Sequence, residues 1–149
     1  IEYIAHKENL TLEEVMRVLN KESGVLGLSG VSSDFRDLIE ARKHGNKHAA
    51  DAVEAFCYRV AKKIGSYVAA LNGVDAIAFT AGIGENSAPV RKMVCEYLGY
   101  LGVTLLEANN ELRGKEVRIS TASSKVAVYV IPTNEELAIA RDTAALVKR

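Results

Sequence analysis

The sequence predicts an α/β fold in which a central β-sheet is flanked by helices. Helical patterns and short apolar strands alternate along the second half of the chain, which is typical of a layered α/β domain. Residues 126–131 are apolar on both faces, with valines on one side and Ala127, Tyr129 and Ile131 on the other. A strand that is apolar on both faces lies in the interior of a sheet. With 149 residues, the chain fits one domain of ordinary size.

The first elements are a helix and a glycine-interrupted segment. Thr11 and Glu14 have the spacing of a capping box, in which each side chain binds the backbone amide of the other residue, and this predicts a short helix through about residue 20. Residues 24–30 are apolar but contain three glycines. This composition indicates an extended segment or a tight loop.

Two further helices follow, and the second is rich in alanine. Asp34 can cap a helix through about residue 44, with Gly45 as its end. Asn46 can cap a long helix to about residue 72, which Gly73 closes. Its alanines widen the apolar surface beyond one stripe (Ala49, Ala50, Ala52, Ala55, Ala61, Ala69 and Ala70). We therefore expect this helix to be covered on more than one side, by a sheet or by a second subunit.

The second half alternates between strands and helices. Residues 74–79 indicate a short buried strand, and residues 88–98 a helix that tolerates Pro89 in its first turn. Residues 117–119 and 126–131 indicate two more strands. A second capping box at residues 133–136 predicts the start of a terminal helix with an apolar inner face (Leu137, Ala140, Ala144 and Val147).

A glycine-rich turn between the first strand and its helix is the most informative segment. Gly82 and Gly84 carry no Cβ, so their backbone can adopt positive φ and let a flat or anionic ligand approach closely. Amides at the start of the next helix would then face the ligand. The same pattern is often only a tight connection. It is not a dinucleotide fingerprint, because Ser87 replaces the third glycine, and no Gly-Lys-Ser/Thr follows as in a phosphate-binding loop.

Composition excludes several functional classes. The chain is 48% apolar and 26% charged with a net charge of zero, so nothing indicates binding to nucleic acid or to an anionic membrane. We expect neither a membrane span nor a signal peptide. Cys57 and Cys95 fall on apolar helix faces and are interpreted as buried hydrophobic residues, which predicts a reducing, cytoplasmic location. Because the sequence begins at Ile1, we also expect it to be a fragment or a processed product.

Polar residues gather at three junctions between elements, at residues 32–37, 82–86 and 133–136. Ligands of open α/β sheets bind at such junctions, beyond the carboxyl ends of strands. Asp34 and Glu135 can offer carboxylate oxygens to Mg²⁺, and Arg36 a planar fork for phosphate. Each also has a purely structural interpretation, as a helix cap or as a solvated helix residue. No arrangement of serine, histidine and acid indicates nucleophilic catalysis.

Three segments in register resemble the acetate kinase family. They are Gly24-Val-Leu-Gly-Leu-Ser-Gly30 with Ser32-Ser-Asp-Phe-Arg36, then Phe79-Thr-Ala-Gly-Ile-Gly-Glu-Asn86, then Ile131-Pro-Thr-Asn-Glu-Glu-Leu-Ala-Ile-Ala-Arg141. The resemblance covers essentially all of residues 1–149 but only the C-terminal part of the family's chain. It implies an actin-like ATPase (ribonuclease H-like) domain with a mixed central sheet. It also implies phosphoryl transfer between ATP and acetate with Mg²⁺, giving acetyl phosphate and ADP.

The resemblance also implies roles for individual residues. Asp34, Phe35 and Arg36 match a nucleotide-contacting segment, residues Gly82, Ile83, Gly84, Glu85 and Asn86 match the adenosine-binding loop, and Glu135 matches a magnesium-binding glutamate. Phe35 stands where the family often has methionine, and Ala81 where many relatives have glycine. Residues 1–149 are thus expected to be the C-terminal nucleotide-binding and dimerisation domain of a homodimeric, cytoplasmic acetate kinase.

The catalytic arginines, histidine and aspartate of the family lie upstream of the matching segments, so we expect no catalytic residue in this chain. Phosphoryl transfer requires both a nucleotide site and a clamp on the acceptor. The isolated chain is therefore expected to be inactive. A propionate kinase of the same family and a noncatalytic nucleotide-binding or assembly module are the alternatives.

Overall fold

The computed structural model describes residues 1–147, which form two compact units. Unit 1 comprises residues 1–63 and unit 2 starts at residue 64, so the boundary falls inside one long helix. The length of the chain predicts a single ordinary domain, whereas its contacts cluster in two groups.

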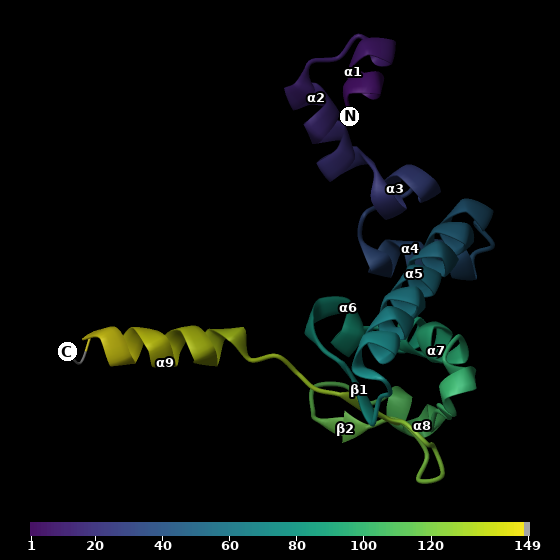
Figure 1. The fold of residues 1–149 in the computed structure, drawn as a ribbon, viewed down its shortest axis with the longest axis vertical. Coiled ribbons are helices and arrows are strands. Elements are labelled where there is room, and N and C mark those ends of the chain that lie inside the picture. Colours follow the sequence, from purple (N-terminus) through teal and green to yellow (C-terminus); the bar gives the residue numbers. More distant parts are fainter. Residues whose placement is uncertain (148–149) are drawn as a thin grey trace. The chain divides into compact units, whose positions relative to one another are not determined.

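Unit 1 is helical, and the helices predicted after Thr11, Asp34 and Asn46 are all present. Its elements are α1 (Glu2–Glu8), α2 (Leu12–Arg17), a π-helical turn (Val18–Glu22), α3 (Gly24–Ser29), α4 (Phe35–Lys43) and the first part of α5 (Lys47–Leu71) (Figure 1). The capping box is confirmed: Thr11 Oγ1 accepts from the amide of Glu14 at 3.2 Å, and Glu14 Oε2 accepts from the amide of Thr11 at 2.7 Å. These bonds satisfy amides that the first turn of a helix leaves without partners.

The prediction of an extended segment or loop at residues 24–30 is wrong, because this segment is helix α3. Gly24 has φ of +65° at the start of the helix, and Gly30 has φ of +63° just beyond its end. The amide of Gly30 donates to Leu26 O at 2.7 Å. Glycine in the left-handed conformation commonly ends a helix. Two of the glycines that indicated a loop therefore mark the two ends of a helix.

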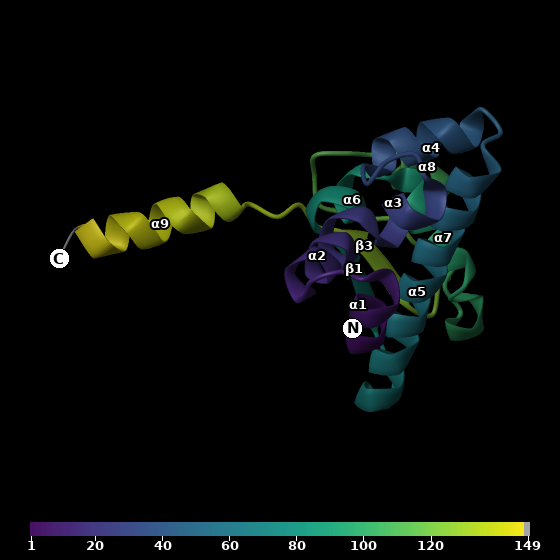
Figure 2. The same cartoon turned by 90° about the horizontal axis from the view of Figure 1, so that it is seen from above.

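The caps predicted for the next two helices are confirmed. Asp34 Oδ1 accepts from the amide of Arg36 at 2.8 Å, and Asn46 Oδ1 accepts from the amide of Ala49 at 2.9 Å. Gly45 and Gly73 have positive φ beyond the ends of α4 and α5. Figure 2 shows α5 as one uninterrupted helix. Short polar side chains at these positions satisfy amides that the helix itself cannot.

The buried residues of α5 form one stripe, although its alanines predict a wider covered surface (Ala49, Ala52, Val53, Cys57 and Ala61). Tyr58, Tyr67 and Leu71 are exposed in this chain. Cover on a second side, by a sheet or by another subunit, stays a prediction.

Unit 2 contains a three-stranded mixed sheet in the order β1-β3-β2, built from β1 (Ala76–Phe79), β2 (Val117–Arg118) and β3 (Ala127–Val130). Strands β1 and β3 are parallel, with Phe79 opposite Val130, while β2 is antiparallel to β3. The interior position predicted for β3 is confirmed. Strand β1 is only half buried, because it lies at the edge of the described sheet and exposes Ala76 and Ala78.

The remaining elements of unit 2 are helices α6 (Ala81–Asn86), α7 (Ala88–Glu96), the 3₁₀ turn Gly99–Leu101, α8 (Glu107–Asn110) and α9 (Glu135–Val147). Helix α7 carries Pro89 in its first turn, as predicted, and buries apolar residues at helical spacing (Val90, Met93, Val94 and, just beyond its end, Leu98). Cys95 is also buried, and burial raises the pKa of its thiol to about 12. Within residues 1–147, no helix is long and apolar enough to cross a membrane.

Helix α9 differs from its prediction in two respects. Its cap is Asn134, whose Oδ1 accepts from the amide of Leu137 at 3.0 Å, instead of the predicted Thr133. None of its residues is buried in this chain, including the predicted inner face at Leu137 and Val147. The apolar pattern indicates a helix correctly, but the described residues do not cover its apolar side chains.

Candidate functional site

Two of the three polar segments line one cavity in unit 2. The cavity has a volume of about 340 Å³ and lies between the start of α6 and the start of α9 (its lining residues are Ala81, Gly82, Glu85, Thr133, Asn134, Glu135 and Glu136). Because β1 and β3 are parallel neighbours, the chain leaves both strands at the same edge of the sheet. This topology brings residues some 50 positions apart into one site, as open α/β sheets do at the carboxyl ends of their strands.

Thr133 connects the two walls of this cavity. The hydroxyl of Thr133 accepts from the amide of Ala81 at 3.2 Å and donates to Glu85 Oε1 at 2.5 Å, while the amide of Thr133 donates to the same carboxylate oxygen at 2.7 Å. These hydrogen bonds hold the pKa of the Glu85 carboxyl below its usual value. Thr133 therefore acts across 48 residues of sequence instead of capping α9. Sequence reasoning missed this role because a Thr-x-x-Glu pattern indicates only a local cap.

The glycine segment is a short helix instead of an open turn. The left-handed residue is Ala81, with φ of +57°, and neither Gly82 nor Gly84 has positive φ. This corrects the prediction that these glycines provide positive φ. Left-handed backbone is unfavourable for a residue with a Cβ, and glycine at position 81 would avoid that strain.

The two glycines have different surroundings. A Cβ at Gly84 would lie 3.4 Å from the carbonyl carbon of Phe79, which is ordinary van der Waals contact between α6 and the end of β1. A Cβ at Gly82 would meet no protein atom within 4 Å. An added Cβ would therefore contact protein atoms at position 84 but none at position 82. Gly82 leaves backbone accessible at the wall of the cavity.

Asn86 and Ile83 complete α6. Asn86 Nδ2 donates to Gly82 O at 2.8 Å, which folds the side chain back over its own helix. Ile83 is half-buried, and its carbonyl accepts from the amide of Ser87 at 3.0 Å. Neither residue lines the cavity, so among the predicted loop residues only Gly82 and Glu85 do.

The cavity is acidic, which favours a cation over a bare phosphate. Glu85, Glu135 and Glu136 all line it, and the carboxylate of Glu85 already binds Thr133. In the part of the chain that the structure describes, no group of three or more His, Cys, Asp or Glu side chains could hold a metal ion. Carboxylate oxygens are nevertheless ligands that Mg²⁺ accepts, and this ion usually takes its other ligands from water and phosphate. Glu135 offers one such carboxylate at the wall of the cavity.

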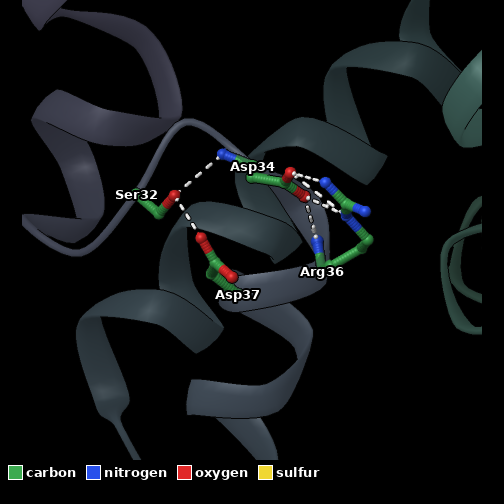
Figure 3. A network of polar contacts seen from close by, with 4 residues as sticks. All are labelled: Ser32, Asp34, Arg36 and Asp37. Carbon is green, nitrogen blue, oxygen red and sulfur yellow. Dashed lines mark hydrogen bonds and ion pairs between the residues drawn. The ribbon is translucent and has the colours of Figure 1, made fainter.

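The third predicted segment lies in unit 1, where Asp34 and Arg36 form a surface network (Figure 3). The guanidinium of Arg36 donates to both carboxylate oxygens of Asp34, with Nη2 to Oδ2 at 2.6 Å. Ser32 Oγ accepts from the amide of Asp34 at 3.0 Å and donates to Asp37 at 2.7 Å. The hydrogen bonds and charge of Arg36 lower the pKa of Asp34 to about 2. The Arg36 side chain is 90% exposed, so its flat face is open to solvent.

Phe35 points away from this network. It is only 9% exposed, and its ring centroid lies 4.4 Å from that of Phe56 in a tilted arrangement. It also lines a largely apolar cavity of about 600 Å³ within unit 1 (with Gly24, Val25, Leu28, Ala55, Phe56, Arg59, Val60 and Lys63). Residues 34–36 belong to unit 1, and residues 82–86 and Glu135 belong to unit 2.

Comparison with known proteins decides the family. A sequence model of the acetokinase family matches residues 1–141. The chain belongs to the acetokinase family. This acetokinase-family chain is 63% identical over 148 residues to the acetate kinase of Agathobacter rectalis, covering 99% of this chain and 37% of that relative. It is 58% identical over 147 residues to the acetate kinase of Lachnoclostridium phytofermentans, with the same two coverages.

Solved structures confirm the predicted fold class. The chain matches a crystal structure of Porphyromonas gingivalis acetate kinase with a TM-score of 0.88 at 43% identity, covering 98% of this chain and 37% of that one. It also matches a propionate kinase from Francisella tularensis with a TM-score of 0.82 at 38% identity, covering 91% of this chain and 34% of that one. This acetokinase-family chain therefore spans about 37% of the length of the curated relatives named above.

Proposed function

We propose that this chain is the nucleotide- and magnesium-binding part of an acetate kinase, which transfers a phosphoryl group reversibly between ATP and acetate. The observation that carries the proposal is the cavity that joins Gly82 and Glu85 to Glu135, because it unites two segments that the family resemblance assigns to adenosine and to magnesium. The high identity to curated acetate kinases supports the choice of reaction.

The chemistry of the cavity agrees with this proposal. Phosphoryl transfer depends on positioning the nucleotide and on neutralising charge in the transition state. Glu135 would supply a carboxylate oxygen to Mg²⁺, and the bound ion would neutralise charge on the phosphate oxygens. Gly82 leaves room for a ligand to approach the backbone. In unit 1, and separately from this cavity, the exposed guanidinium of Arg36 offers donors to phosphate or a flat face to a base. Asp34 orients that guanidinium through its ion pair.

The acceptor clamp is proposed to come from the N-terminal part of a longer protein. We therefore expect the 149 residues alone to bind magnesium–nucleotide weakly and to form no acetyl phosphate. Assembly as a homodimer and a cytoplasmic location belong to the same proposal, and light scattering after size exclusion tests the oligomeric state.

A chimera tests the proposal directly. The matching C-terminal part of Agathobacter rectalis acetate kinase is replaced by this chain, which is 63% identical to it. Acetyl phosphate formation from ATP and acetate is measured for the chimera, for Glu135→Gln and for Glu136→Gln. Both glutamates line the cavity at the start of α9, so the second variant is a matched control for loss of charge. We expect loss of activity in Glu135→Gln, with partial recovery at high Mg²⁺, and a much smaller effect in Glu136→Gln.

A well-folded but inactive chimera would contradict the proposal, and equal effects of the two glutamate variants would contradict the assignment of Glu135. An inactive chimera that still binds ATP would instead support the noncatalytic nucleotide-binding module.

Propionate kinase is the second candidate, favoured by the likeness to the Francisella tularensis structure. Because the proposed acyl pocket lies outside this chain, the chimera should keep the acyl preference of the enzyme that supplies its N-terminal part. A second chimera with the N-terminal part of that propionate kinase tests this, by comparing kcat/KM for acetate and propionate.

A further inference from the structure

We infer that Arg91 is a positioning residue that holds the 81–86 segment in place from behind. The role of this segment in nucleotide binding rests on the proposed function. The attachment of the segment, meaning its hydrogen bonds to Arg91, rests on contacts within unit 2. Arg91 has no exposed surface, although it is a charged residue on α7. Arginine is almost never fully buried unless its charge and donors are matched. Its contacts therefore require an explanation beyond the packing of the core.

The donors of Arg91 divide between two neighbours. Nη1 donates to the carbonyl oxygens of Gly84 at 2.9 Å and of Glu85 at 2.8 Å, both in the last turn of α6. Nε donates to Asn110 Oδ1 at 2.9 Å, and Nη2 donates to the carbonyl oxygen of Asn110 in α8. Asn110 is itself buried and donates from Nδ2 to Ala88 O at 3.0 Å. The planar fork of the guanidinium thus joins α6 to α8, and Asn110 in turn joins α8 to the start of α7.

This arrangement addresses a specific weakness of α6. A helix of six residues has little stability of its own, and its last carbonyls have no partners within the helix. A cation at the carboxyl end of a helix satisfies these carbonyls and interacts favourably with their partial negative charge. Burial lowers the pKa of Arg91, although its guanidinium stays charged at neutral pH. The energetic penalty of burying the charge is offset only while these acceptors stay in place, which couples the arginine to the position of α6.

Glu85 is consequently fixed at two points. Its carbonyl accepts from Arg91, and its carboxylate accepts from Thr133 across the cavity. Gly84, held by the same guanidinium, is the glycine that packs against Phe79. Without Arg91, the segment would lose its hydrogen bonds to this guanidinium and keep those to Thr133. We therefore expect the loss of Arg91 to weaken the site for nucleotide while leaving the acyl substrate unaffected.

Amide hydrogen exchange of the full chain without nucleotide tests the attachment. Arg91→Met removes the donors and keeps a long apolar side chain. Lys92→Met makes the same kind of change at the next residue of α7, an exposed lysine that pairs with Glu107 at 2.8 Å. We expect exchange in peptides covering residues 82–86 to become about tenfold faster or more in Arg91→Met, and to stay unchanged in Lys92→Met. Equal exchange in the two variants would overturn the inference.

Kinetics of the chimera separate positioning from a general loss of stability. In Arg91→Met we expect KM for ATP to rise about tenfold or more and KM for acetate to change less than about twofold. Arg91→Lys, which keeps the charge but cannot span both neighbours, should lie between Arg91→Met and the unchanged chimera. A fall in kcat with both KM values unchanged, or exchange that rises uniformly along the chain, would assign Arg91 a structural role only.

A further variant keeps the inference testable if Arg91→Met does not fold. Asn110→Ala removes the acceptor of Nε and the bond to Ala88, but leaves the charge and the contacts to α6. We expect a smaller change of the same kind, confined to the same peptides, and no local change would overturn the inference.

Protection of residues 82–86 by magnesium–ATP in the unchanged chimera tests the proposed function separately. If protection is absent while Arg91→Met still accelerates exchange, the attachment stands and the nucleotide role fails.

Discussion

Gly82→Ala should stabilise the chain and weaken nucleotide binding at the same time. Gly82 lies within α6 and has no positive φ, and a Cβ added there would meet no protein atom within 4 Å. Alanine is favoured over glycine in a helix by about 0.5–1 kcal/mol. For a chain of this size, such a gain raises the melting temperature by about 1–4 °C. The folded chain by itself therefore gains from the substitution.

The effect on binding should have the opposite sign. If nucleotide approaches the backbone at Gly82, a methyl group occupies that approach, and crowding of this kind costs about 1–3 kcal/mol. The corresponding loss of affinity is about 5- to 150-fold in Kd. Thermal denaturation measures the first effect, and calorimetric titration with ATP and excess Mg²⁺ measures the second. Both are measured on the chimera.

Gly99→Ala is the matched control. Gly99 also has no positive φ and no atom within 4 Å of an added Cβ, but it lies in the 3₁₀ turn after α7 and does not line the cavity. We expect a small change in melting temperature and unchanged affinity. If Gly82→Ala is more stable and binds nucleotide as tightly as the unchanged protein, the backbone at position 82 does not contact the ligand. That result would refute the inference that the space beside Gly82 is where the nucleotide approaches the backbone.

Three other predictions concern charge and packing. Thr133→Val should raise the pKa of Glu85 toward its usual value, because the hydroxyl donor to its carboxylate is lost. Carbon-13 NMR titration of the Glu85 carboxyl group measures this shift, and an unchanged pKa would contradict the hydrogen bonding between Thr133 and Glu85. Asp34→Asn keeps the cap but loses the charge. Folding lowers the pKa of Asp34 from 3.8 to about 2. The ionised carboxylate therefore contributes its full stabilisation above pH 3.8, and this contribution is lost as pH falls through about 2. Urea denaturation of both proteins should therefore show a difference in stability that shrinks on acidification, and a constant difference would contradict this. Leu38→Ala, at a fully buried position, should lower the free energy of unfolding by about 2–5 kcal/mol, whereas exposed Leu12→Ala should change it by less than about 0.5 kcal/mol.

Local signals in the sequence predict where helices α2, α4, α5 and α7 begin. The capping box at Thr11, the caps at Asp34 and Asn46 and the position of Pro89 are all found where the sequence places them. Each of these signals acts within four residues, so its outcome depends little on the rest of the chain. The same locality explains the error at residues 24–30, where glycine punctuation indicated a loop but marks helix ends. A glycine indicates that the backbone can adopt unusual conformations, but it does not indicate whether the neighbouring residues form a loop or a helix.

The sequence by itself determined the family and the interior position of β3, because three segments in register and a strand apolar on both faces are patterns along the chain. Only the tertiary structure decided that Thr133 binds Glu85 instead of capping α9, that Ala81 takes the left-handed conformation, and that Arg91 is buried behind the cavity. Threonine, alanine and arginine are common in helices and at their ends, so their local patterns favour ordinary roles. Their actual partners lie up to 52 residues away and are brought close by the parallel pairing of β1 with β3 and by packing among α6, α7 and α8.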